Sequence, residues 1–233
     1  DGTTNLNTTA THIKSIDATW VTGTSGGGLP SGIFPAVAET WYRVMVVGGA
    51  AVTAQIGFDT SPTATNILND AAAGYDKFRH IGWIRTDSSI NVQTFYSAEN
   101  YPNFIRWQQS ERLVVRTVGW VVDVAQTVDA SNCAPPNALA EINFGIEVGP
   151  QAGNDIFAFN VTGSGFGLAQ SNASLGTDHA IQIVARSTGG GVHFSSTLIR
   201  IPIGPTQDFY WVASRTSSTP SDQTYCNRVG FYF

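Results

Sequence analysis

The sequence predicts an all-β fold: an antiparallel β-sandwich, jelly-roll-like, with an extended N-terminal arm. Apolar and β-branched segments of roughly four to eight residues recur at short intervals, as strands of a sandwich do. Turn residues punctuate them, with 24 Gly and 10 Pro in 233 residues. No stretch sustains a helical period over about ten residues, which argues against βαβ units.

The first part of the chain differs in composition from the rest. Residues 1–10 are rich in Thr and Asn and are expected to be extended, and residues 12–21 could form a strand. Residues 23–32 are expected to be a flexible connector, because Gly admits positive φ and Pro interrupts strand pairing. We therefore predict an arm and linker over residues 1–33 and one β-sandwich domain over residues 34–233.

The body of the chain reads as a succession of strands. A short helical turn is expected at residues 66–73, ended by Gly74. The expected strands are 41–47, 54–58, 78–85, 92–96, 104–107, 113–124, 139–148, 155–161, 179–185, 192–201, 209–213 and 225–233.

Composition excludes several classes of partner. Charged residues make up 12% of the chain, the net charge is −5, and no Lys/Arg run is present. Nucleic-acid binding is not expected without a basic patch. Membrane insertion is not expected because no apolar stretch approaches about 18 residues. Low charge with 42% hydrophobic residues fits a protein partly covered by neighbouring subunits, or one outside the cell. A monomer with an uncharged polar surface is the alternative.

The two cysteines, Cys133 and Cys226, are far apart in the sequence. They lack the close C-x-x-C spacing of a redox pair, and two cysteines alone cannot complete a structural zinc site. They form either a disulfide that ties the loop at 133 to the last strand or two free thiols.

No catalytic, metal or cofactor site is indicated. Residues 23–27 match G-x-S-x-G, but glycines and a Leu-Pro follow where a nucleophile elbow needs a helix. The four histidines stand alone. Cleavage of a glycosidic bond would need two carboxylates on facing elements. Asp123, Glu141 and Glu147 are the candidates, and pairing with arginines across strands is their structural alternative.

One group of aromatic residues suits carbohydrate binding. Tyr96, Tyr101 and Trp107 flank the polar residues 97–100. Aromatic rings can stack on the C–H faces of sugars while neighbouring polar groups hold hydroxyls. The alternative is that these rings belong to the core and rim of the sandwich.

Three segments form a larger pattern: Thr-Trp-Tyr-Arg-Val at 40–44, Ile-Gly-Phe-Asp-Thr-Ser at 56–61 and Ala-Gly-Tyr-Asp-Lys-Phe-Arg-His-Ile-Gly-Trp-Ile-Arg-Thr-Asp at 73–87, followed by Ile90, Phe95, Phe104 and Trp107. In its order and spacing this pattern resembles a recurrent module of tailed-bacteriophage virion proteins. The resemblance covers roughly residues 34–125. The chain departs from the pattern at Arg43, His80 and Trp83.

The resemblance implies a fold and a setting but no catalytic residue. Proteins with this module include tail fibres and receptor-binding proteins, most often homotrimers that contact other virion proteins. We therefore expect a non-enzymatic protein of the virion surface, assembled in the bacterial cytoplasm, that contacts a host surface glycan. A head fibre, decoration or other purely structural virion protein is the alternative, and a polysaccharide depolymerase is the third.

Overall fold

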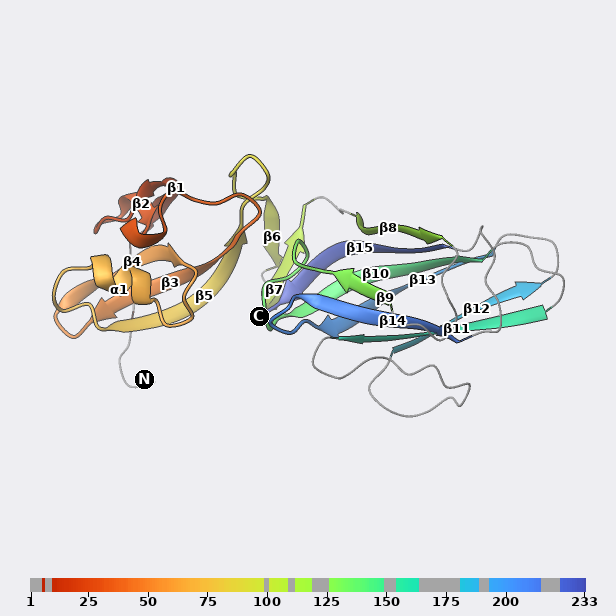
Figure 1. Ribbon diagram of the computed structural model, residues 1–233. Helices are drawn as coiled ribbons and strands as arrows, with labels where there is room; N and C mark the ends of the chain where they lie inside the picture. Colours follow the sequence, from red (N-terminus) through yellow and green to blue (C-terminus); the bar gives the residue numbers. More distant parts are fainter. Residues whose placement is uncertain are drawn as a thin grey trace. The chain divides into compact units, whose positions relative to one another are not determined.

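The computed structural model is shown in Figure 1. It describes Leu6 and residues 10–98, 101–108, 112–118, 126–148, 154–163, 181–188, 193–214 and 223–233. The chain divides into two compact units, Asp1–Gln93 and Thr94–Phe233. The two units meet between Gln93 and Thr94. The sequence suggests a boundary at residue 33 instead, between an arm at 1–33 and a single sandwich at 34–233.

The first unit is built on a three-stranded antiparallel sheet with the order β4-β3-β5. Its strands are β3 (Trp41–Gly49), β4 (Val52–Asp59) and β5 (Lys77–Arg85), and its helix is α1 (Thr65–Asp70). The helix lies where a short helical turn was expected, at residues 66–73, but it ends at Asp70, before Gly74. A core cluster joins sheet and helix, and comprises Trp20, Met45, Val47, Ala64 and Ile67.

The segment expected to be an arm and a flexible linker is folded into this unit. β1 (Ile13–Thr19) pairs in parallel with β2 (Ser25–Leu29), and the short 3-10 helix η1 (Ser31–Ile33) follows. Trp20 anchors the pair, because its buried indole donates a hydrogen bond to the Ile56 carbonyl at 3.0 Å. Glycine serves close packing here: a Cβ at Gly28 would lie 2.7 Å from the Phe58 ring.

The second unit is a two-sheet sandwich (Figure 1). One sheet has the order β13-β10-β15-β7-β6, with β8 also paired to β15, and the other has the order β12-β11-β14-β9. The strands are β6 (Phe95–Ala98), β7 (Tyr101–Trp107), β8 (Arg112–Val118), β9 (Gln126–Asp129), β10 (Leu139–Val148), β11 (Asn154–Gly163), β12 (Ile181–Thr188), β13 (His193–Pro202), β14 (Asp208–Ser214) and β15 (Gln223–Tyr232).

The pairing of these strands is nested. The antiparallel pairs are β8 with β15, β9 with β14, β10 with β13, and β11 with β12. The chain from β8 to β15 is therefore one long hairpin folded over into two four-stranded sheets. This is the topology of a jelly roll, and it confirms the predicted antiparallel, jelly-roll-like sandwich.

The core of the second unit lies between its two sheets. Phe144 of β10 contacts Trp211 of β14 across the sandwich, with ring centroids 6.3 Å apart. Alternate residues of the strands point to opposite faces, so one parity of each strand fills the core. The buried inward residues of the larger sheet include Ala140, Ile142, Phe144, Ile146, Ile199, Ile201 and Phe231.

Candidate functional site

The expected aromatic group is not a single cluster. Tyr96, on β6, is 58% exposed, whereas Trp107, on β7, is 5% exposed. The Trp107 indole donates a hydrogen bond to the Cys133 carbonyl at 2.9 Å, and the Arg228 guanidinium lies 4.4 Å from the centre of its ring. The backbone of Tyr101 belongs to β7, and its side chain lies outside the described residues. Trp107 is thus a core residue and Tyr96 a surface one.

Tyr96 belongs to a row of residues that crosses the larger sheet. It pairs with Arg106 of β7, which pairs with Gly230 of β15. Gly230 pairs with Glu141 of β10, which pairs with Arg200 of β13. Directly opposed residues point to the same face of a sheet. These five residues, the outer-face row, therefore share the face that turns away from the core.

A bulge in β15 directs the side chain of Tyr232 to this outer face. The pairing with β10 shifts between Glu141 and Ile142, so that Val229 is the extra residue. Arg228, before the bulge, points into the core. Phe231, after the bulge, also points into the core and is fully buried. Tyr232 consequently points to the outer face. Bulges commonly redirect side chains in this way near functional sites.

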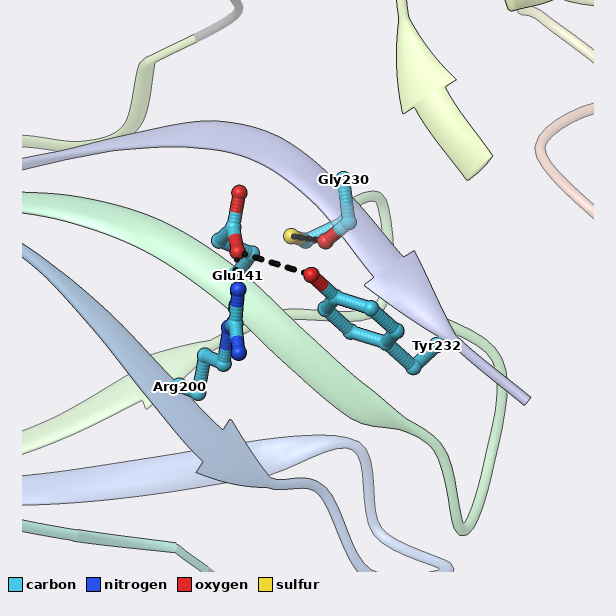
Figure 2. A network of polar contacts seen from close by, with 5 residues as sticks. Glu141, Arg200, Gly230 and Tyr232 are labelled. Carbon is cyan, nitrogen blue, oxygen red and sulfur yellow. Dashed lines mark hydrogen bonds and ion pairs between the residues drawn. The ribbon is translucent and has the colours of Figure 1, made fainter. Parts of the chain in front are cut away.

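Glu141 lies between Arg200 and Tyr232 in a network of polar contacts, shown in Figure 2. Its Oε2 accepts a hydrogen bond from Arg200 Nε at 2.9 Å and one from the Tyr232 hydroxyl at 3.3 Å. The Glu141 side chain is 7% exposed and the Arg200 side chain 58% exposed. Because one partner is buried and both are hydrogen-bonded, the ion pair fixes the geometry more firmly than a fully exposed pair would.

The rings around Glu141 form a stacked series. The Arg200 guanidinium lies 4.8 Å from the centre of the Tyr232 ring. Phe104 of β7 packs against the Tyr232 ring itself, with ring centroids 4.6 Å apart and planes inclined by 32°. Gly230 permits this stack, because a Cβ there would lie 2.7 Å from the Phe104 ring. Phe104, Tyr232 and the Arg200 guanidinium thus form a stacked group on the outer face, called here the aromatic platform.

The candidate carboxylates do not form a catalytic pair on this face. Glu141 and Glu147 both belong to β10 and point to the same face, six residues apart. At about 3.3 Å per residue they are separated by about 20 Å. Paired glycosidase carboxylates lie about 5–9.5 Å apart. Asp123 lies outside the described residues.

The two cysteines are buried free thiols in this structure. Of the two alternatives, the structure therefore shows free thiols and not a disulfide. The Cys133 thiol is directed at the Gly230 carbonyl, 3.9 Å away, beneath the candidate face. Burial raises the pKa of Cys133 to about 12 and also raises the pKa of Cys226, so both stay protonated at neutral pH.

Among the described residues, no three His, Cys, Asp or Glu side chains are gathered closely enough to hold a metal ion. No helix in the described ranges is both long and apolar enough to cross a membrane.

Sequence reasoning named Tyr96 and Glu141 but did not place them together, and it missed Arg200 and Tyr232. The assembly depends on cross-strand register between residues far apart in the sequence, such as Glu141 and Tyr232, which are 91 positions apart, and Phe104 and Tyr232, which pair across a still longer interval. The aromatic end of the last strand was a signal for Tyr232, but the bulge that directs it outward has no clear signature in the sequence.

Comparisons with known proteins do not assign a family. No family model matches the chain, and no curated protein matches it. Among solved structures, it is similar to a chain of infectious bursal disease virus strain Gx, with 14% identity, a TM-score of 0.19, and coverage of 83% of this chain and 61% of that one. A chain of T=1 particles derived from that virus gives 14% identity, a TM-score of 0.15, and coverage of 88% and 61%. This chain thus spans about three fifths of the length of these viral chains.

Proposed function

We propose that this protein is a non-catalytic virion protein of a bacteriophage, of tail-fibre or receptor-binding type. In this proposal its jelly-roll unit contacts a host surface glycan through the outer face of the larger sheet. The observation that carries the proposal is the outer face itself. The aromatic platform of Phe104 and Tyr232 adjoins the hydrogen-bonded Glu141 and Arg200, and the exposed Tyr96 lies on the same face, three strands from Glu141.

The platform has the two components that sugar recognition requires. Exposed ring surface stacks on the apolar faces of a pyranose, and fixed polar groups at its border hold the hydroxyls. Here the Glu141–Arg200–Tyr232 network fixes the polar groups before any ligand arrives. Preorganisation of this kind lowers the entropic cost of binding.

The phage setting is supported by the resemblance of the first unit. Its matching segments fall on β3, on the end of β4 with the following turn, and on β5 with the turn before it. Asp59 of the second segment is fully buried, and its carboxylate accepts the backbone N–H of Ile67 at 3.0 Å. The motif residues thus have structural roles, which fits a module that transfers a fold rather than a reaction.

The first experiment is a glycan-array assay with the purified 233-residue chain, with release of reducing ends measured on every hit. Y96A should weaken binding at least tenfold, which corresponds to about 1.4 kcal/mol. F78A is the matched control, because Phe78 is a partly exposed aromatic residue of the first unit, 37% exposed. Equal binding by Y96A would rule out this face as the site. Release of reducing ends would show a depolymerase instead.

A purely structural role as a head fibre or decoration protein is the second candidate. It is favoured by β13, which pairs only with β10 among the described strands and carries Leu198 at 56% exposure. An uncapped edge strand with an exposed apolar residue is suited to contact with another chain. Failure of every glycan to bind, together with incorporation into particles, would favour this role.

A further inference from the structure

We infer that the outer-face row selects an acidic glycan, with the Arg106 guanidinium binding a sugar carboxylate beside the ring of Tyr96. The inference rests on the proposed function and adds to it the chemical class of the ligand. It starts from the different surroundings of the two arginines in the row.

Arg200 is already engaged. It donates to Glu141 at 2.9 Å and covers the Tyr232 ring at 4.8 Å. Glu141 is the acidic residue of the row, and it also accepts the Tyr232 hydroxyl. The negative charge of Glu141 is therefore balanced within the network, and it is not available to balance a second arginine.

Arg106 is differently placed. It is exposed, and no hydrogen bond or ion pair joins it to another residue in the described part of the chain. It stands between Tyr96 on one neighbouring strand and Gly230 on the other. Gly230 is buried and the Phe104 ring occupies the space where its side chain would lie, so a ligand group approaches the guanidinium from the side of the exposed Tyr96.

The charge balance of the outer-face row favours an anion. The outer-face row carries two arginines and one glutamate, in a chain whose net charge is −5. The other described acid on this face of β10, Glu147, lies about 20 Å from Glu141 along the strand. A guanidinium binds a carboxylate through two parallel hydrogen bonds, and it does so better than an ammonium group can.

The aromatic rings next to Arg106 can stack on the sugar that carries the carboxylate. Tyr96 lies directly opposite Arg106, and Phe104 is two residues from Arg106 on the same strand and face. Side chains in such positions lie within about 5–8 Å of one another. A uronic acid that stacks on one of these rings would bring its carboxylate within reach of Arg106.

The test measures binding of the 233-residue chain to three immobilised polymers. They are a polysaccharide rich in uronic acid, the same polysaccharide after reduction of its carboxyl groups, and a phosphate-linked polyol polymer. Binding should be strongest to the uronic-acid form, should fall at least tenfold after carboxyl reduction, and should weaken with added salt because salt screens an exposed charge contact. R106Q should lose the same factor on the acidic polymer and nothing on the reduced one.

R79Q is the matched control, because Arg79 is an exposed arginine on β5 of the first unit and its loss changes the net charge equally. Unchanged melting temperature would show that R106Q is folded. Equal binding of the acidic and reduced polymers, or an equal loss in R79Q, would overturn the inference. Preference for the phosphate polymer through Arg106 would overturn the carboxylate assignment.

The outcomes separate this inference from the proposed function. If neutral glycans bind in a Tyr96-dependent manner and R106Q binds like the unmodified chain, the proposed function stands and the acidic class is wrong. If no glycan binds at all, both fall together.

Discussion

Gly230 is the residue on which the candidate face most depends. A Cβ at this position would press against the Ile105 carbonyl oxygen and lie 2.7 Å from the Phe104 ring. The same glycine separates Arg106 from Glu141 in the outer-face row. Its missing side chain therefore serves the packing of β7 on β15 and also the shape of the surface.

We expect G230A to destabilise the second unit by about 1–3 kcal/mol, the usual cost of inserting atoms into a packed region. Urea denaturation followed by circular dichroism measures the change. G32A is the control, because a Cβ at Gly32 would meet no atom within 4 Å. A G230A midpoint equal to that of G32A would show that β7 and β15 are less closely packed than described.

The buried thiols make a second prediction at this scale. Cys133 and Cys226 should not react with a thiol reagent at about pH 8 in the native protein, because burial keeps both protonated and inaccessible. After denaturation without reductant, both should react. Two unreactive cysteines in the denatured chain would instead show that the protein carries the disulfide.

The pKa of His80 leads to a third prediction at the scale of single residues. Burial lowers its pKa, the Gly82 carbonyl 2.7 Å away opposes this, and the Arg43 charge lowers it further. The unfolded chain, with a His pKa of about 6.5, then binds more protons than the native one in the window just below that value. The free energy of unfolding should be at its full value above about pH 6.5 and decrease as pH falls through this window.

The measurement for His80 is the urea midpoint of the first unit, followed by tryptophan fluorescence between about pH 5 and pH 8. The Trp83 ring is a local reporter, 5.0 Å from the imidazole. H80Q should flatten the dependence below pH 6.5. A dependence as steep in H80Q as in the unmodified chain would assign it to other groups.

At the scale of elements, α1 depends on a residue outside it. Its N-cap, Ala64, has φ of +53° and offers no side-chain hydrogen bond. Asp59, at the end of β4, supplies the cap: its carboxylate accepts Ile67 N–H at 3.0 Å and Asn66 Nδ2 at 2.6 Å. The helix is thus tied to the sheet through one buried carboxylate.

D59A should destabilise the first unit by about 2–3 kcal/mol, because it removes hydrogen bonds to a charged group and leaves a buried N–H unsatisfied. Hydrogen exchange of the Ile67 amide, with the urea midpoint, measures the effect. T65A is the control, since the exposed Thr65 hydroxyl bonds only the Ser61 and Thr63 hydroxyls. Equal exchange rates in D59A and T65A would remove Asp59 from this role.

The element pattern was largely readable from the sequence, because strands alternate and turn residues separate them. The expectation for 139–148 coincides with β10, and that for 41–47 falls within β3. β2 was missed because its Ser-Gly-Gly-Gly-Leu sequence has no strand propensity, and packing against Phe58 decides its conformation. β9, four residues long, was too short to identify.

The candidate site was harder to predict from the sequence than the strands were. Tyr96 could be named as an exposed aromatic residue, but its companions depend on register. Glu141 and Arg200 are 59 residues apart and meet because β10 and β13 pair without a shift. For Trp107 the sequence left two alternatives, a sugar-binding surface or the core of the sandwich, and the structure places it in the core at 5% exposure.

At the scale of the whole molecule, the low charge makes a prediction about assembly. With 12% charged residues and an edge strand that carries Leu198, the chain should associate with itself, and the phage resemblance makes a homotrimer the expected form. Light scattering coupled to size exclusion should give about three times 24.8 kDa. L198E should shift the mass toward the monomer if β13 lies in the interface, and a monomeric unmodified chain would contradict the prediction.

The nested pairing of the jelly roll has a consequence for how the protein is made. β11 and β12 pair across the shortest interval, whereas β8 must wait for β15, more than a hundred residues later. During synthesis the first unit can complete its fold before any of these strands emerges. The outer-face row, which needs Gly230, is assembled among the last features, so a ribosome-bound chain that stops short of β15 would carry Tyr96, Arg106 and Glu141 without a surface to join them.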